Sequence, residues 1–307
     1  MKGNVTGFVQ RCTRAAVCLL LPGLVGGCQS ERHEELRGSL YFGAGPYLAR
    51  LDLRDGSTSV VTNLGDAEIR GISPQLDERL LLTVFGSVNR QDVHRLILYD
   101  KETRQTLGLV TGRHGRYLPG TKILVYDDGV SIRIAEKIRG SWEKSVIAEH
   151  RYNASMKILP ISAKRFLYAE SGQPIHAFDN IAKRSIELAA LSERCDLAAA
   201  LWIPERERLL CRTRRADGLF EYPFVALDGA VHDSLAVPGK RSFRPIAWLP
   251  DQETIVLTER WRSALSDRQK HAVWVYRFDA GDHYRLLDDQ HLGDSVVYEP
   301  NRAASHP

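Results

Sequence analysis

Six segments of this sequence repeat one pattern, in which a short apolar stretch ends at a proline and is followed by a polar turn. After five of the six prolines, a strand-like run rich in Leu, Val and Ile follows the turn. The prolines are spaced 45, 41, 44, 46 and 50 residues apart, at Pro74, Pro119, Pro160, Pro204, Pro250 and Pro300. A period in the low forties with about four short strands per repeat is typical of β-propeller blades. Proline suits the end of an innermost strand, because a turn begins there and no ladder donor is needed.

The two ends of the repeat region predict the number of blades. Three strand-like stretches precede the first proline motif, within residues 39–64, and one lone strand, "SVVYEP", ends the series at residues 295–300. Three strands plus one make a complete blade, so we expect an all-β, six-bladed propeller closed by the C-terminal strand beside residues 39–43. Such closure leaves no long exposed edge. A seven-bladed ring with one degenerate blade remains the alternative.

Most repeats also contain an aspartate that follows an apolar residue at the end of a later strand. Its carboxylate can accept a hydrogen bond from the backbone two residues further on, which favours a turn. The third repeat lacks this marker, which occurs at Asp100, Asp179, Asp228 and Asp279.

The N-terminus has the charged-then-apolar order of an export signal. Residues 1–14 contain Lys2, Arg11 and Arg14 without any acidic residue, and residues 15–25 are almost wholly apolar. Eleven residues are too few to span a bilayer, since a helix needs about 20. The pattern therefore predicts a segment that is removed after export.

Residues 25–28, Val-Gly-Gly-Cys, resemble the lipobox of bacterial lipoproteins. The resemblance implies a signal peptide at 1–27, a lipidated Cys28 with a polar tether at 28–38, and the propeller at 39–307. Diacylglycerol and acyl groups on Cys28 are the only attached groups expected, with no other cofactor. Gln29 in place of an aspartate implies anchoring at the outer membrane, facing the periplasm. A soluble secretory signal with an incidental cysteine is the alternative.

Removal of the signal changes the charge and cysteine inventories. Three of the 42 basic residues leave with it, so the net charge falls from +4 to +1. That charge gives no electrostatic case for nucleic-acid binding. Cys195 and Cys211 are the cysteines that remain besides Cys28, and in an oxidising compartment such a pair tends to bridge. The predicted hairpin, however, places Ala200 opposite Cys211, so the sequence leaves the disulfide open.

Two of the repeats, "ISPQLDERLLL" and "WLPDQETIVL", resemble the W-S-P-D-G-x-x-h-h-h repeats of TolB-type propellers, which are relatives of WD40-like repeats. The likeness covers nearly all of the chain after the signal. No repeat keeps the full tryptophan, aspartate and glycine set, and the N-terminal α/β domain of TolB is absent. The resemblance therefore implies a fold and a bacterial-envelope location, but a shared fold does not transfer function.

The segments that lead into the inner strands should converge on one mouth of the central channel. They carry ten basic positions, one of them a histidine, against five acidic ones, and the candidate binding residues are Arg70, Arg113, His114, Arg116, Lys157, Arg241 and Arg244. An arginine fork matches phosphate or carboxylate, so we expect an anionic ligand or an acidic protein surface as partner. The alternative is a solvated rim in a chain that favours arginine over lysine throughout.

No common catalytic signature occurs in the chain, and we assign no catalytic residue and no metal ligand. We favour a non-catalytic binding or scaffold module. The alternative is a hydrolase or lactonase with a channel metal held by Glu68, Asn153, Asp196 and Asp294. Trp261, between two arginines in the long connection of the last blade, is a candidate interface anchor, because Trp and Arg dominate binding hot spots. It could equally cover its own loop.

Overall fold

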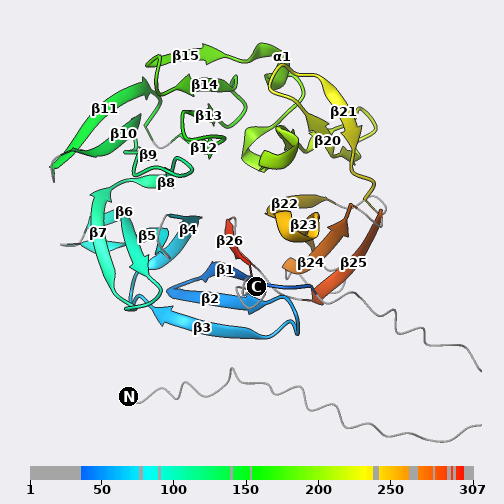
Figure 1. Ribbon diagram of the computed structural model, residues 1–307, viewed down its shortest axis with the longest axis horizontal. Coiled ribbons are helices and arrows are strands. Elements are labelled where there is room, and N and C mark those ends of the chain that lie inside the picture. The colour runs from blue at the N-terminus through cyan, green and yellow to red at the C-terminus, as the bar shows by residue number, and fades with distance from the viewer. Residues whose placement is uncertain are drawn as a thin grey trace, which may run out of the picture. The chain divides into compact units, whose positions relative to one another are not determined.

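The computed structural model describes residues 36–75, 79–88, 91–138, 141–152, 154–237, 242–262, 269–278, 281–288, 292 and 295–300. The described residues between 36 and 300 belong to one compact unit, which contains all six core clusters and the closing strand. Its described strands form six four-stranded antiparallel sheets arranged as blades around an axis (Figure 1). The prediction of six blades is confirmed, and the seven-bladed alternative is wrong.

The blades follow one another along the chain, each running from an inner to an outer strand. The first blade contains β26 (Val296–Glu299), β1 (Ser39–Ala44), β2 (Tyr47–Asp52) and β3 (Thr58–Asn63). The second contains β4 (Glu68–Pro74), β5 (Arg79–Val88), β6 (Gln91–Asp100) and β7 (Thr106–Thr111). The third contains β8 (Arg113–Tyr117), β9 (Leu124–Asp127), β10 (Ser131–Ile138) and β11 (Ser141–Glu149).

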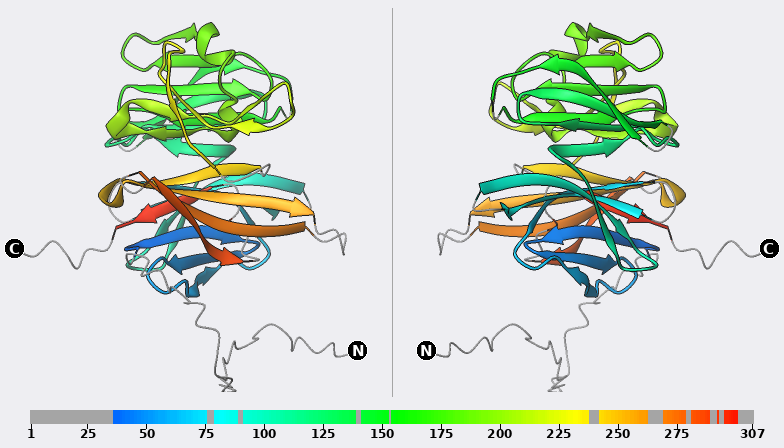
Figure 2. Two further views of the ribbon diagram at one scale, coloured as in Figure 1. Left: turned by 90° about the vertical axis from the view of Figure 1, so that its right-hand side faces the viewer. Right: turned by 90° about the vertical axis from the view of Figure 1, so that its left-hand side faces the viewer.

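The remaining three blades complete the ring, which Figure 2 shows from two sides. The fourth contains β12 (Met156–Pro160), β13 (Arg165–Glu170), β14 (His176–Asp179) and β15 (Arg184–Glu187). The fifth contains β16 (Leu201–Ile203), β17 (Arg208–Leu210), β20 (Pro223–Val225) and β21 (Val231–Ser234), with a small hairpin of β18 (Thr213–Arg214) and β19 (Phe220–Glu221). The sixth contains β22 (Phe243–Leu249), β23 (Thr254–Arg262), β24 (Gln269–Arg277) and β25 (Asp282–Asp288).

Four short helical segments join these strands. They are α1 (Ala189–Ser192), η1 (Leu197–Ala199), η2 (Pro204–Arg206) and η3 (Pro250–Gln252). Pro204 and Pro250 each open a 3-10 turn directly after an inner strand, which is the role that the repeat predicted for proline. Each turn closes at a glutamate in the left-handed region, at φ 50° and 41° respectively, before the second strand begins.

The repeated aspartates form the expected turns. A side-chain oxygen of Asp100 accepts the Thr103 N–H at 2.9 Å, and Asp179 accepts the Ile181 N–H at the same distance. Asp228 accepts the Ala230 N–H at 2.9 Å. Asp279 lies outside the described residues.

The ring closes in the first blade, as predicted. Strand β26 pairs antiparallel with β1, with Ser39 opposite Glu299 and Phe42 opposite Val296. Side chains reinforce the closure, because the Tyr41 hydroxyl donates to Glu299 at 2.9 Å and Lys101 of the second blade also bonds that carboxylate. Closure thus ties the first and last strands of the described chain to each other and to the turn after β6 in the second blade.

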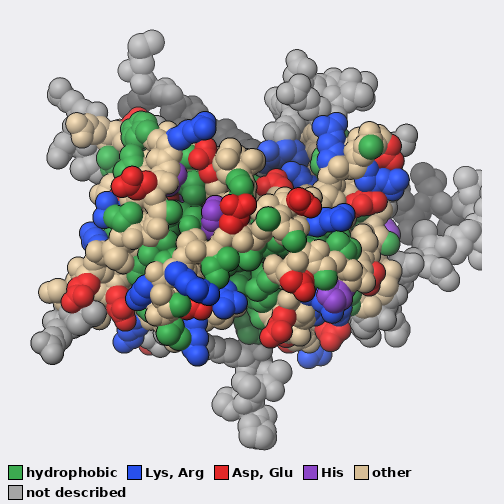
Figure 3. All heavy atoms as spheres, turned by 90° about the horizontal axis from the view of Figure 1, so that it is seen from above, with side chains coloured by type: hydrophobic (Ala, Val, Ile, Leu, Met, Phe, Trp, Pro, Cys, Tyr) green, Lys and Arg blue, Asp and Glu red, His purple; other side chains and the backbone are tan. Residues whose placement is uncertain are grey.

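The hydrophobic core is divided into clusters of buried residues rather than gathered in one centre. One cluster joins Leu40 and Leu51 of the first blade to Val256 and Val275 of the sixth. Another joins Leu48 to Leu80 of the second blade. Packing of neighbouring sheets face to face is how a propeller buries its apolar residues. The outer surface over the blades that are uppermost in Figure 1 mixes acidic and basic side chains (Figure 3).

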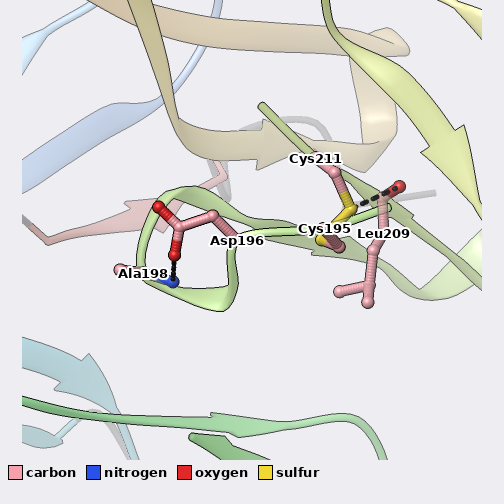
Figure 4. Close-up of a disulfide and its surroundings, with 5 residues drawn as sticks. All are labelled: Cys195, Asp196, Ala198, Leu209 and Cys211. Carbon is pink, nitrogen blue, oxygen red and sulfur yellow. Dashed lines mark hydrogen bonds between the residues drawn. A yellow bond between two sulfur atoms is a disulfide. The ribbon is translucent and has the colours of Figure 1, made fainter. Parts of the chain in front are cut away.

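Cys195 and Cys211 form a disulfide with an S–S distance of 2.02 Å (Figure 4). The pairing of Leu201 with Leu210 places Ala200 at the position opposite Cys211, as the sequence indicated. The turn η1 brings Cys195 back to the strand nonetheless, and Asp196 caps that turn by accepting the Ala198 N–H at 3.0 Å. Within the described residues, none of the helices has the length and apolar character needed to cross a bilayer.

Candidate functional site

The inner strands all run the same way along the channel, so their first residues meet at one end and the proline turns meet at the other. We call these the basic end and the proline end. A cavity of about 170 Å³, the basic cavity, lies at the basic end, and a cavity of about 390 Å³, the apolar cavity, lies at the proline end. The basic cavity is lined by six of the predicted binding residues, Arg70, Arg113, His114, Arg116, Lys157 and Arg244.

The structure therefore gathers these six side chains, but on different elements from those expected. The sequence placed them in loops, whereas they lie in the inner strands β4, β8, β12 and β22. The loop assignment is wrong because strand pairing continues to the basic end, where Arg113 is paired with Asp127 and Arg244 with Thr258. Strands hold a side chain more firmly than loops do. Arg241, the seventh candidate, lies outside the described residues.

Strand β8 contributes three of the basic residues through a β-bulge. The register shifts between Arg113 and Arg116, and His114 adopts a positive φ of 53°. A bulge leaves extra residues unpaired and re-aims their side chains. Gly115 is required here, since a Cβ at this position would lie 2.6 Å from a methyl carbon of Leu96. The sequence Arg-His-Gly-Arg thus directs three basic side chains at one cavity.

Most of the lining cations have partners of their own. Arg113 contacts the buried carboxylate of Asp127 at 2.7 Å, and Arg70 pairs with Glu68 at 2.7 Å. Arg244 donates to the Ala198 carbonyl at 3.1 Å.

Arg116 differs from them. It donates to the Gly115 carbonyl at 2.8 Å, and no carboxylate among the described residues lies within ion-pair distance. Arg116 therefore places a positive charge in the channel that the described side chains do not neutralise.

Electrostatics at the basic cavity favour an anion. Burial lowers the pKa of Arg116 to about 10, so the guanidinium stays charged near neutral pH. Burial, followed by the charges of Arg116 and Arg113, lowers the pKa of His114 to about 3. Burial also lowers the pKa of His94, with Arg113 and Arg70 as further causes. The imidazoles are therefore neutral while the arginines are charged, and a bound anion would relieve the repulsion among them.

Several residues of this cavity were missed by the sequence analysis, and two of them bear on the ligand. Thr83 of β5 and His94 of β6 line it, and the buried atoms Thr83 Oγ1 and His94 Nδ1 have no hydrogen-bond partner. Buried polar atoms without a partner are uncommon in folded proteins, so they point to a ligand or water. The cross-strand register, in which Glu68 is paired with Phe85 and Phe85 with His94, is the signal that would have placed His94 here.

The basic cavity also opens toward the fourth and fifth blades. Lys157 and Ala198 line both it and a groove of about 650 Å³. That groove carries Arg194, Arg212 and Arg214, together with Glu170 and Glu193. The groove thus adjoins the basic cavity and carries charges of both signs, with Asp196 as a third carboxylate.

The four residues that could act as metal ligands are not brought together in the described part of the chain. Glu68 is paired with Arg70, and Asp196 caps η1, while Asn153 and Asp294 lie outside the described residues. Groups of three or more His, Cys, Asp or Glu side chains able to hold a metal do not occur in the described part of the chain. No observation therefore favours a channel metal over an anion.

Trp261, the candidate interface anchor, lies in β23 rather than in the connection that follows it. The guanidinium of Arg285 lies 5.2 Å from the centre of its ring, a cation–π arrangement. Trp261 is thus held against its own blade and is partly exposed.

No protein-family model and no curated protein matches the sequence. Solved structures do resemble the propeller. TolB from Acinetobacter baumannii superposes with a TM-score of 0.56 at 12% identity, over 84% of this chain and 65% of that one. A putative TolB from Agrobacterium tumefaciens gives 0.56 at 14% identity, over 86% of this chain and 99% of that one. This chain therefore has the six-bladed fold of TolB-type propellers and spans less than two thirds of the Acinetobacter protein.

Proposed function

We propose that this protein is a non-catalytic binding module of the bacterial envelope, anchored by lipid at Cys28 and binding an anionic ligand or an acidic protein surface at the basic end of its channel. The TolB-type fold supports a binding or scaffold role. The export signal, the lipobox-like residues before Cys28 and Gln29 after it support attachment at the outer membrane, facing the periplasm.

One observation carries the proposal: four inner strands deliver five cationic side chains and the neutral imidazole of His114 to one cavity, although residues 28–307 have a net charge of only +1. A patch of one sign in a recessed, low-dielectric place attracts the opposite charge more strongly than the net charge suggests. Arg116 is the centre of this patch, because the described carboxylates leave it without an ion pair.

Photocrosslinking at the basic end tests the proposal. Tyr152 follows β11 in the segment leading to β12 and is 77% exposed, so a photoreactive residue placed there should capture whatever binds at this end. The charge-reversal pair Arg116→Glu with Arg244→Glu should abolish the capture. A photoreactive residue at Val60, 64% exposed on the outer strand β3, is the matched control. Equal capture with and without the charge reversal, in correctly folded protein, would contradict the proposal.

The lipid anchor is tested separately. Mass spectrometry of the protein isolated from membranes should show an N-terminal Cys28 with diacylglycerol and acyl groups, and Cys28→Ser should abolish the modification. An unmodified Cys28 thiol would remove the anchor from the proposal without affecting the channel.

A further inference from the structure

The inner strands change chemistry along their length. Arg116 of β8 is followed two residues later by Leu118, just past the end of the strand, and on β12 Lys157 is followed by Leu159. The same order recurs on β22, where Ile246 follows Arg244. Each of these apolar residues lines the apolar cavity. The channel is therefore basic at one end and apolar at the other.

The two cavities meet inside the channel. Arg116, Lys157, Ile158, Arg244 and Ser295 line both of them. The basic cavity, at about 170 Å³, is smaller than the about 300–1,000 Å³ of typical small-molecule sites, whereas the apolar cavity at about 390 Å³ falls within that range. An ion alone would fill the first and leave the second empty.

We propose that the channel binds a small anionic amphiphile, with a phosphate or carboxylate head at Arg116 and an apolar body in the apolar cavity. This inference rests on the proposed anion-binding function and narrows it to a ligand class. A surface docked on the basic end would leave the apolar cavity unused. An amphiphile is the ligand that meets both linings at once.

The polar atoms without partners are placed to complete the head-group site. Thr83 Oγ1 and His94 Nδ1 line the same cavity as Arg116, from the second and third strands of the second blade. A threonine hydroxyl can donate to a head-group oxygen, and so can a neutral imidazole in the matching tautomer. Charge-assisted bonds to an oxyanion are about twice as strong as neutral ones, so the guanidinium of Arg116 should dominate.

Three ligands distinguish the contributions of the basic and apolar cavities to binding. Acetate has the charged head alone, hexanoate has the head and an apolar tail, and 1-hexanol has the tail without a charge. Calorimetric titration of the full-length protein should give the tightest binding with hexanoate. Each methylene buried should tighten the dissociation constant by about four-fold, so hexanoate should bind far more tightly than acetate.

Two variants test which end of the channel binds the charged head of the ligand and which binds its apolar tail. Arg116→Gln should weaken hexanoate at least ten-fold and leave 1-hexanol nearly unchanged, since a bond to a charged group is lost. Leu201→Asn, in the wall of the apolar cavity, should weaken hexanoate and 1-hexanol but not acetate. Arg184→Gln, the same change on the exposed outer strand β15, is the matched control and should alter nothing. Thermal unfolding of each variant checks that it is folded.

The outcomes separate this inference from the proposed function. Acetate and hexanoate binding equally, both dependent on Arg116, would overturn the amphiphile and keep the anion site. No binding of either carboxylate, with crosslinking at position 152 still sensitive to charge reversal, would also overturn it, in favour of a protein partner. No carboxylate binding and no charge-sensitive crosslinking would overturn both.

Discussion

His114 should make the propeller sensitive to acid, and His114→Asn should reduce that sensitivity. Burial beside Arg116 and Arg113 lowers the pKa of His114 from 6.5 to about 3 in the folded protein. Between those two values the unfolded chain binds a proton that the folded chain does not, so the free energy of unfolding falls as the pH falls. Asparagine is the replacement of choice, because it tolerates the positive φ of this position.

The size of the effect follows from the pKa difference. Each pH unit in this window corresponds to about 1.4 kcal/mol, so the group should cost about 2–3 kcal/mol of stability between pH 6.5 and pH 4.5. Urea unfolding, followed by the fluorescence of the five tryptophans, measures the free energy of unfolding at each pH. The loss on acidification should be smaller in His114→Asn by about that amount.

A matched control separates this histidine from the others. His232→Asn replaces an exposed imidazole on the outer strand β21 and should leave the acid-dependent loss as in the unaltered protein. Because other groups contribute to the total slope, the difference between the two variants is the decisive quantity. Equal pH dependence in His114→Asn and His232→Asn would refute the reasoning.

Three further changes test other parts of the structure. Replacing both Cys195 and Cys211 by alanine should lower the free energy of unfolding by about 3 kcal/mol, because the disulfide closes a loop with a sequence separation of 16 residues. The variant should be less stable than the oxidised protein and as stable as the reduced protein. Arg116→Met should stabilise the unliganded propeller by about 1–2 kcal/mol, since a partly buried cation without a carboxylate is costly, and a loss of stability in urea unfolding would contradict it. Tyr298→Phe should cost about 1–2 kcal/mol, because its hydroxyl donates to Asp251 at 2.7 Å and so links the closing strand β26 to η3 of the sixth blade. Thermal unfolding unaltered by this change would show that the bond contributes nothing.

The sequence predicted the architecture because each blade repeats the same local chemistry. Pro204 and Pro250 begin turns where the repeat required them, and Asp100 and Asp179 close turns through their own carboxylates. These are short-range effects that a linear pattern records. The pairing of β26 with β1 could be inferred as well, because the three strands left over near the start of the repeats and the one left over at their end make a single blade.

Only part of the site was predicted, because the rest depends on strand register, turns and bulges that a linear pattern does not contain. Arg116 and Arg244 were identified because inner strands converge on the axis, whereas His94 was passed over because its position depends on the register of three paired strands. The disulfide could not be decided from hairpin pairing, since η1 displaces Cys195 by a turn that the strand pattern does not contain. Neither the bulge in β8 nor the size of the two cavities has a counterpart in residue spacing.

The pairing of β26 with β1 has a consequence for how the protein is made. The first three strands of the first blade emerge from the ribosome early, yet their inner neighbour at residues 296–299 follows every other described strand of the ring. Contacts of such long sequence separation are slow to form and leave an open strand edge until they do. Until that moment β1 presents an unpaired backbone edge, which exposes the nascent chain to pairing with strands of other molecules.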